Sequence, residues 1–299
     1  MKTKISILII LFSLSVSYST FAQLTVLSGP DQLSYYRFVE DMNDVLGNDT
    51  LKPLINKSTN GAGYNFDQLV DPKSPYKLAL IQEDVLYYMS ALDHRDNTKK
   101  TKDLKVVFPL ASEQIQVVTR KNTGINKLQD LKEKMVAIGT TDQGTYMTAN
   151  YIKIRSKVYW RSRNIHIDDA LNELYMDRID AFFIVGTAPI SILNIDPRAM
   201  VKGLDLMELD NFNGWADYYE NDTIYKGTYK WLEKDVPTYS VQTVMVVNTS
   251  KLTDEDKTEL NAFMSGLRAN IDKLKETGHP KWKDVDLNNW NPDDWPLYK

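Results

Sequence analysis

The sequence predicts an α/β protein of two domains with mostly parallel sheets, and three observations lead to this prediction. Short apolar segments of strand type alternate with segments whose apolar residues recur at helical spacing. The length of 299 residues corresponds to roughly two domains. The composition, with 42% hydrophobic and 25% charged residues, is ordinary for a globular protein.

The N-terminus is expected to lie outside the fold. Lys2 and Lys4 precede an apolar run that begins at Ile5, and small residues lie around Ala22. This pattern is typical of a secretory signal peptide cleaved near Ala22 (residues 1–22). The alternative, a membrane anchor, is disfavoured because the run is shorter than the ~20 residues that span a bilayer. The chain has no cysteine, so no lipid anchor can form at the cleavage site. The mature chain is therefore expected to be periplasmic or secreted, monomeric and not membrane-anchored.

The first half of the mature chain predicts three strand–helix units and a pair of strands. Strands are predicted over 24–27, 51–56, 77–81, 104–110 and 114–119, and helices over 33–46, 64–70 and 84–92. Helices that separate strands in this way are typical of βαβ units.

The second half continues the alternation. Strands are predicted over 135–138, 179–185 and 241–247, and helices over 144–154, 167–176 and 252–274, with a further helix after the loop that begins at Gly186. Thr253 is the predicted N-cap of the last helix, because a threonine hydroxyl accepts a bond from the free N–H groups of the first turn.

Small or polar loops follow at least four strands and open helices. They lie at 28–29, 59–63, 140–145 and 186–187. Ligands of open α/β sheets bind at the carboxyl ends of strands, and helix N-termini favour anions. Any one such loop is most simply a helix cap. Four of them, divided between two domains, predict a binding cleft for a small anionic or zwitterionic molecule.

The motifs of common enzyme classes are missing. The three histidines are isolated, and the sequence contains no cysteine, nucleophile elbow, P-loop or zincin helix. The acid pairs Asp41 with Asp44 and Asp168 with Asp169 are interpreted as solvated helix faces. A net charge of -4 argues against a nucleic-acid partner. We therefore expect no enzymatic activity, no cofactor and no metal.

A series of motifs spread over nearly the whole mature chain resembles one family. The motifs are Ser28-Gly29 with Tyr35-Tyr36, Thr59-Asn-Gly-Ala-Gly-Tyr-Asn65, Ala79-Leu-Ile-Gln-Glu-Asp84, Leu128-Gln-Asp-Leu-Lys132, Val136-Ala-Ile-Gly139, Gln143-Gly-Thr145 and Arg178-Ile-Asp-Ala-Phe-Phe183. In order and spacing they resemble the TAXI family, the extracytoplasmic solute-binding proteins associated with TRAP transporters.

The resemblance implies a type II periplasmic-binding-protein fold, in which two α/β lobes are joined by two crossing strands. Lobe 1 would comprise residues 23–116 and 242–299 and lobe 2 residues 117–241, with crossings near 114–119 and 239–246. It implies capture of a small carboxylate or amino-acid ligand, glutamate-like in the family, for a TRAP membrane permease. The alternative is the same fold acting as a ligand sensor or protein-interaction module without a transporter.

The resemblance and the strand-end loops together supply the candidate ligand-binding residues. They are Gly29, Tyr36, Thr59, Asn60, Asn65, Gln82, Asp84, Thr140, Thr141, Gln143, Gly144, Thr145 and Gly186. The chain departs from the family at Asp142-Gln143, where small residues are usual, and at Glu133, where a glycine is usual. An acid at position 142 would repel a carboxylate or pair with an ammonium group.

Aromatic residues offer a second set of ligand contacts, with core packing as the alternative. The set comprises Tyr64, Tyr146, Trp215, Tyr218, Tyr219 and Tyr239. The tail from Trp290 to Trp295 is expected either to pack back onto lobe 1 or to contact a partner.

Overall fold

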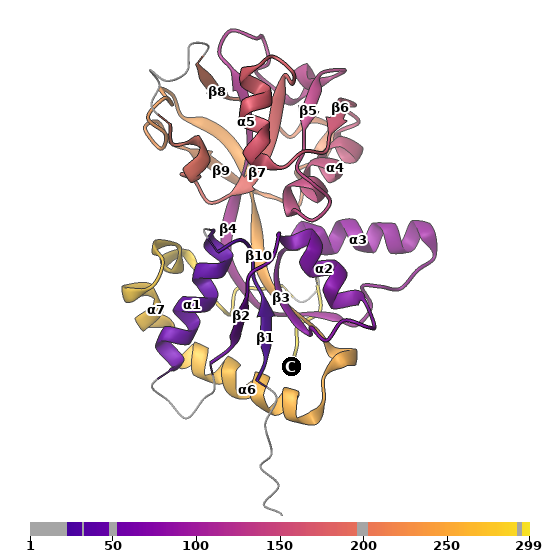
Figure 1. The fold of residues 1–299 in the computed structure, drawn as a ribbon, viewed down its shortest axis with the longest axis vertical. Coiled ribbons are helices and arrows are strands. Elements are labelled where there is room, and N and C mark those ends of the chain that lie inside the picture. The colour runs from indigo at the N-terminus through magenta and orange to yellow at the C-terminus, as the bar shows by residue number, and fades with distance from the viewer. Residues whose placement is uncertain (1–22, 32, 48–52, 196–202, 292–294) are drawn as a thin grey trace, which may run out of the picture.

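The computed structural model describes residues 23–31, 33–47, 53–195, 203–291 and 295–299. The predicted signal peptide, residues 1–22, lies outside this part of the chain. Two α/β lobes are stacked along the long axis of the molecule (Figure 1). Two long strands, β4 (Leu104–Arg120) and β10 (Val236–Asn248), run through both lobes and pair antiparallel with each other.

The strands of both lobes form one hydrogen-bonded sheet. Besides β4 and β10 they are β1 (Thr25–Leu27), β2 (Ile55–Lys57), β3 (Leu78–Gln82), β5 (Met135–Ala137), β6 (Arg161–Arg163), β7 (Ala181–Gly186), β8 (Leu204–Leu206) and β9 (Glu220–Ile224). Their order is β2-β1-β3-β10-β4-β7-β5-β6, with β8 paired to β4 and β9 paired to β10. The pairs of β1 with β2 and β3, and of β5 with β6 and β7, are parallel, as the alternation predicts.

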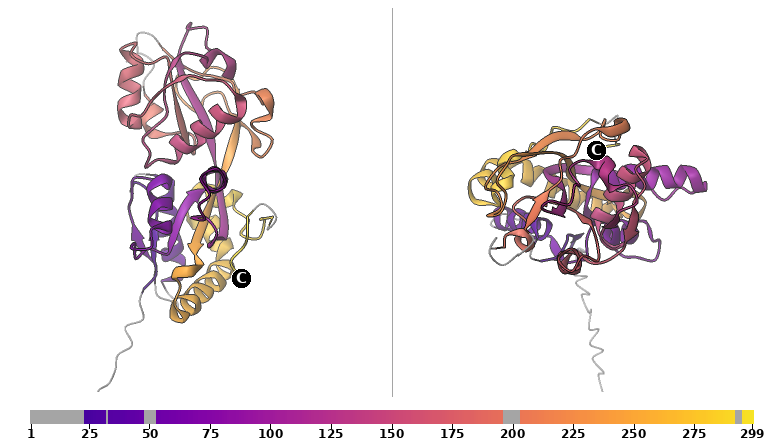
Figure 2. Two further views of the ribbon diagram at one scale, coloured as in Figure 1. Left: turned by 90° about the vertical axis from the view of Figure 1, so that its right-hand side faces the viewer. Right: turned by 90° about the horizontal axis from the view of Figure 1, so that it is seen from above.

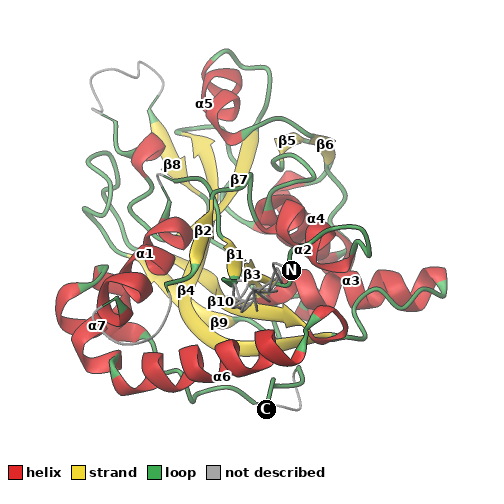
Figure 3. Cartoon of the chain, turned by 60° about the horizontal axis from the view of Figure 1, so that its bottom comes forward, coloured by secondary structure: helices red, strands yellow, loops and turns green. Residues whose placement is uncertain are grey.

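Helices cover both faces of the lobe 1 sheet (Figure 3). One face packs against α1 (Ser34–Leu46), α6 (Asp254–Ala269) and α7 (Ile271–Thr277), and the other against α2 (Ala62–Val70) and α3 (Glu83–Asp96). Lobe 2 carries α4 (Gly144–Ser156) and α5 (Ile167–Tyr175). Of the helices in the described ranges, none is long and apolar enough to cross a membrane.

The crossing segment differs from the prediction of two separate strands over 104–110 and 114–119. Residues 111–113 between them continue the extended backbone, so that β4 is a single strand of 17 residues. Ser112 and Glu113 pair with Gln242 and Val241 of β10 in the same ladder that joins the two lobes. Their polar side chains interrupt the apolar pattern but leave the backbone bonds intact.

Three other element predictions need correction. Of the strand predicted over 51–56, residues 51 and 52 lie outside the described ranges, and the described part forms a strand at Ile55–Lys57. The helix predicted over 252–274 is two helices, α6 and α7, which meet at Asn270. Where a helix is expected after Gly186, the described residues 187–195 form a 3-10 turn, Ser191–Leu193. Thr253 is confirmed as the N-cap of α6, where its hydroxyl accepts a bond from the Asp256 N–H.

The C-terminal tail packs back onto lobe 1, which decides between the two alternatives. The indole N–H of Trp295 donates to the carbonyl of Leu104, 3.0 Å away, and Leu297 forms a parallel bridge with Val106 of β4. The indole of Trp290 donates to the carbonyl of Trp295. The tail therefore covers the exposed edge of β4 in lobe 1.

Asp41 corrects the interpretation of its helix face as solvated. The residue is 2% exposed and accepts bonds from the Trp282 indole, at 2.8 Å, and from the His279 backbone N–H, at 2.7 Å. It also pairs with Arg37 at 2.7 Å. Asp41 thus holds the segment after α7 against α1. Asp44, by contrast, is exposed, with a side chain that is 72% accessible.

Candidate functional site

The predicted loops of the two lobes contact each other directly. The backbone N–H of Tyr64, at the start of α2, donates to the carbonyl of Asp142 at 3.0 Å. The Asn60 amide donates to the Asp142 carboxylate at 3.2 Å. Gly63 permits this contact, because a Cβ there would lie 2.2 Å from the Thr141 carbonyl oxygen. Asp142, the departure from the family pattern, therefore joins the lobes in this closed arrangement.

The N-terminus of α4 is ordered by its own side chains. The Gln143 side-chain oxygen accepts a bond from the Thr140 N–H at 3.0 Å. The Thr145 hydroxyl accepts one from the Val185 N–H at 3.1 Å, which ties α4 to the end of β7. Gly144 lies against the carboxamide of Gln82 from lobe 1. The place where the sequence predicts a ligand anion is thus covered by a side chain of the opposite lobe.

Asp84 is buried at this contact and receives bonds from lobe 2. Its Oδ2 accepts from the Thr148 hydroxyl of α4 at 2.6 Å and from the Tyr219 hydroxyl at 2.9 Å. The residue is 2% exposed, and its Oδ1 has no hydrogen-bond partner. Burial raises the pKa of the Asp84 carboxyl to about 6, since desolvation disfavours the charged form more than these bonds favour it.

Glu113 is a second buried carboxyl group, on the crossing strand β4. It accepts bonds from the Tyr35 hydroxyl at 2.9 Å and from the Gln82 amide at 3.2 Å. Burial raises its pKa to about 7, and the nearby Asp84 charge adds to the increase. Neither Glu113 nor Asp84 forms an ion pair with any cationic side chain in the described ranges.

Three residues of this cluster are absent from the candidates, namely Tyr35, Glu113 and Thr148, while Tyr219 was named only in the aromatic set. Glu113 carries one visible signal, because it is an acid within the apolar segment 104–119. Tyr35 was quoted for the family motif, but its neighbour Tyr36 was chosen. Tyr36 is partly buried, and its carbonyl accepts a bond from Asn56.

Other candidates have structural roles in this arrangement. Asn65 is fully buried, and its amide donates to the carbonyl of Ser28, just after β1, and to that of Leu80 within β3. Thr59 donates to the Asn65 side-chain oxygen at 2.7 Å. Gly29 packs against Tyr35, where a Cβ would stand 3.3 Å from the tyrosine Cβ. Gly186 pairs with Gln114 at the end of β7.

The aromatic candidates mostly belong to the lobe 2 core. The Trp215 ring contacts Tyr219 and Tyr239 at centroid distances of 5.3 and 5.1 Å, and all three are buried. Tyr218 is 70% exposed, while Tyr64 and Tyr146 are partly buried. Of this set, only Tyr219 reaches the buried carboxylates.

Glu133, the other departure from the family pattern, lies in a turn. Its φ of 62° lies in the left-handed region, where glycine is usual.

Among the described residues, no group of three or more His, Asp or Glu side chains is placed to hold a metal ion.

A polar cleft of about 490 Å³ also spans the lobes, and none of the thirteen candidates lines it. It lies beside β9 and the 3-10 helix η6 (Pro280–Asp284). The left panel of Figure 2 shows the N-terminal part of lobe 1 (indigo) and the C-terminal segment (yellow) on opposite sides of that lobe. We call this cleft the back cleft and the contact of α2 and α3 with α4 the front contact.

The fold is similar to three solved structures. The periplasmic binding protein BugD aligns with a TM-score of 0.53 and 12% identity over 91% of this chain and 90% of BugD. Protein AF1704 from Archaeoglobus fulgidus aligns with a TM-score of 0.50 and 13% identity over 93% and 86% of the two chains. The effector binding domain of QuiR in complex with shikimate has a TM-score of 0.50 and 9% identity over 83% and 97%.

These similarities confirm the predicted fold, in which two α/β lobes are joined by two crossing strands. At 9–13% identity they concern the fold alone. The family comparison is more specific, because the model of the NMT1-like family matches residues 33–288. That range contains both crossing strands and the front contact, and the chain belongs to the NMT1-like family.

Proposed function

We propose that this chain is an exported solute-binding protein that captures a small carboxylate or amino-acid-like ligand between its lobes. The proposal takes residues 23–116 and 242–299 as lobe 1 and residues 117–241 as lobe 2. Family membership and the likeness to the periplasmic binding protein BugD support it. The lobes would part by bending of β4 and β10, the two strands that connect them.

The observation that carries the proposal is the pair of buried carboxyl groups at the front contact. Within the described part of the chain, Asp84 and Glu113 accept side-chain bonds only from neutral donors, and Asp84 Oδ1 has no partner. A buried charge without a counter-ion is costly, so such a pair is well suited to a ligand that supplies a positive group. This favours an amino acid over a plain carboxylate.

The two ends of such a ligand would meet different surfaces. Its ammonium group would lie near Asp84 and Glu113. Its carboxylate would lie at the first turn of α4, near Gly144 and Thr145, where unpaired N–H groups and the helix dipole favour an anion. Gln82 covers that turn in the closed protein, so its carboxamide must move aside when the ligand enters.

Calorimetric titration with the common amino acids and dicarboxylates tests this proposal. We expect micromolar binding of at least one amino acid, with an affinity at least tenfold lower in Asp84→Asn. Asp96→Asn, on the exposed end of the same helix, serves as the matched control and should bind like the wild type. Failure of every amino acid and dicarboxylate to bind at millimolar concentration would refute the proposal.

The membrane partner that we propose is a TRAP-type permease, as the family resemblance suggests. Reconstituted vesicles that contain a candidate permease should take up the ligand only when the wild-type protein is added. N-terminal sequencing of the exported protein should place its first residue just after Ala22.

A ligand sensor that works without a transporter is the second candidate. The likeness to the effector binding domain of QuiR favours it, since that domain binds an effector rather than a transported solute by its description. Affinity capture under native conditions separates the two. A permease recovered with the ligand-loaded protein supports transport, whereas a receptor or regulator recovered in its place supports sensing.

A further inference from the structure

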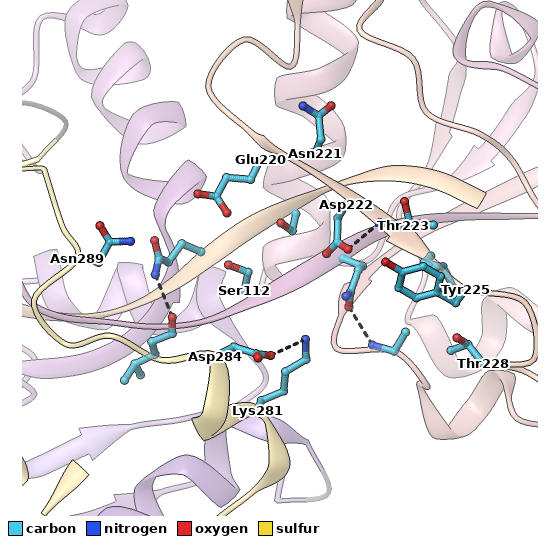
Figure 4. A pocket seen from close by; sticks show the side chains of 16 residues that line it. Ser112, Glu220, Asn221, Asp222, Thr223, Tyr225, Thr228, Lys281, Asp284 and Asn289 are labelled. Atoms are coloured by element: carbon cyan, nitrogen blue, oxygen red, sulfur yellow. Dashed lines mark hydrogen bonds and ion pairs between the residues drawn. The ribbon is translucent and has the colours of Figure 1, made fainter. Parts of the chain in front are cut away.

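The back cleft is built from both lobes and from the strands between them. Lobe 2 contributes Glu220 to Tyr225 of β9 and its following turn, and lobe 1 contributes Lys281, Asp284 and Asn289. Ser112, Gln114, Ser240 and Gln242 of β4 and β10 line it on the side of the crossing strands. Figure 4 shows Ser112 together with the lining residues of β9 and η6. Its volume of about 490 Å³ lies within the usual range for small-molecule sites.

Two largely buried polar residues that line the cleft have side-chain groups without a protein partner. Gln114 and Ser240 are 8% and 5% exposed and lie directly opposite each other in the β4–β10 ladder. The Gln114 side-chain oxygen accepts from the Ala188 N–H at 3.1 Å, while its amide nitrogen has no partner among the described residues. The Ser240 hydroxyl has no partner in the described ranges either. Since both residues line the cleft, these two groups are available to a molecule bound there.

The charges around the cleft determine which molecule fits. Glu220, Asp222 and Asp284 contribute three carboxylates, and Lys281 is the cationic residue among those that line the cleft. The Lys281 ammonium pairs with Asp284 at 3.3 Å, which leaves Glu220 and Asp222 without an ion pair in the described ranges. The two lie on the strand β9, beside the crossing strand β10.

We propose that the back cleft is a second binding site, which takes a small solute with primary amine groups. Its ammonium group pairs with Glu220 and Asp222, and its remaining polar atoms bond with Gln114 and Ser240. This site is separate from the front contact and shares no residue with it.

Occupancy of this site is coupled to closure of the lobes. The cleft and the front contact lie on opposite faces of the lobe 1 sheet, because η6 packs with α1 and α7 on one face and α2 and α3 cover the other. Both include residues from each lobe. A rotation about β4 and β10 that parts the front contact brings β9 toward η6 and narrows the back cleft. A solute held in the back cleft therefore opposes opening of the lobes. By linkage, the solute raises the affinity of the front contact for its ligand, and the front ligand raises the affinity of the back cleft for the solute by the same factor.

Titration with 1,4-diaminobutane tests the site. We expect a dissociation constant below 1 mM for the wild type and a loss of at least tenfold in Glu220→Gln/Asp222→Asn. Ser240→Ala should weaken binding while it keeps the backbone ladder. The matched control is Asp169→Asn/Glu233→Gln, which removes two exposed lobe 2 carboxylates outside the cleft and should bind like the wild type. Absence of binding to the wild type, or equal losses in both double variants, overturns the proposal.

A protein whose lobes are crosslinked at the front contact tests which of the two sites binds the amine. Because the chain has no cysteine, Asn60→Cys/Asp142→Cys can be joined across the front contact by a short bifunctional thiol reagent. The crosslinked protein should bind 1,4-diaminobutane as tightly as before, or more tightly. Loss of amine binding on crosslinking would place the amine at the front contact and overturn the proposal. Amino acid binding at the front should be lost on crosslinking, so the two proposals can fail independently.

Discussion

The side-chain oxygen of Gln82 occupies the position at which residue 144 would carry its β-carbon. A Cβ built on Gly144 would lie 1.5 Å from Gln82 Oε1, a distance that no real contact allows. Gln82 ends β3 in lobe 1, and Gly144 begins α4 in lobe 2. The closed arrangement of the lobes therefore requires glycine at position 144 for as long as Gln82 holds this conformation.

Gly63→Ala is expected to hold the lobes apart, because its Cβ would lie 2.2 Å from the backbone oxygen of Thr141 in lobe 2. Small-angle scattering should show a larger radius of gyration than in the wild type. Gly144→Ala provides the contrast, because its Cβ would meet only the flexible end of the Gln82 side chain, which can turn aside. The radius of Gly144→Ala should therefore stay close to that of the wild type. An unchanged radius in Gly63→Ala would contradict this prediction.

Asp84 and Glu113 should make the free energy of unfolding of the ligand-free protein fall as pH rises. Their pKa values in the folded protein, about 6 and about 7, exceed the ordinary values of 3.8 and 4.5. Between about pH 4 and 7 the folded protein therefore keeps protons that the unfolded chain has released, and the free energy of unfolding falls as pH rises.

Urea unfolding at pH 5 and pH 8 measures this dependence. Other carboxylates also titrate, so the quantity to compare is the difference between the wild type and Asp84→Asn/Glu113→Gln. The free energy of unfolding of the variant minus that of the wild type should be larger at pH 8 than at pH 5. The same difference at both pH values would show that the two groups ionise alike in the folded and unfolded states.

Ligand affinity should show the opposite trend with pH. The ammonium group of an amino acid gains most from Asp84 and Glu113 once both are ionised. Calorimetric titration should therefore give tighter binding at pH 8 than at pH 5, and Glu113→Gln should reduce the change. A ligand without a cationic group should not tighten as pH rises, and this provides the control.

Asp41 should contribute strongly to the stability of lobe 1. Asp41→Ala leaves the Trp282 indole and the His279 N–H without an acceptor, and leaves Arg37 without its partner at 2.7 Å. Removal of one member of such a buried network costs about 3 kcal/mol. Asp44→Ala, on the same helix but exposed, should cost less than about 0.5 kcal/mol. Chemical denaturation of both variants makes the comparison, and equal costs would contradict it.

The order of the elements could be predicted because it depends on local patterns. The buried segment β3 has an unbroken apolar sequence up to Gln82, and α1 repeats its apolar residues at helical spacing. Thr253 was recognisable as an N-cap for the same reason, since its capping partner Asp256 lies three residues away. The single strand β4 was missed because Ser112 and Glu113 break the apolar pattern, although their backbone pairs with β10.

The candidate site could be predicted only in part. The sequence placed Gln82 and Asp84 at the carboxyl end of a strand, where the structure brings them to the facing lobe. It named Tyr219 only among the aromatic alternatives, because the bond of Tyr219 to Asp84, 135 residues away, forms only where the two lobes meet. Glu113 was missed likewise, because its partner Tyr35 lies 78 residues away. Asp41 was misjudged, since the tryptophan that buries it follows 241 residues later.

The sequence by itself determined that this protein is a two-lobed α/β chain whose strands end in small polar loops. Periodicity, glycines and capping residues act over a few positions, so they can be read without a structure. Only the tertiary structure decided that these loops touch one another, that Asp84 and Glu113 are buried without a counter-ion, and that a polar cleft lies at the back of the crossing strands. Burial and charge compensation depend on contacts between distant segments, and the fold alone brings those segments together.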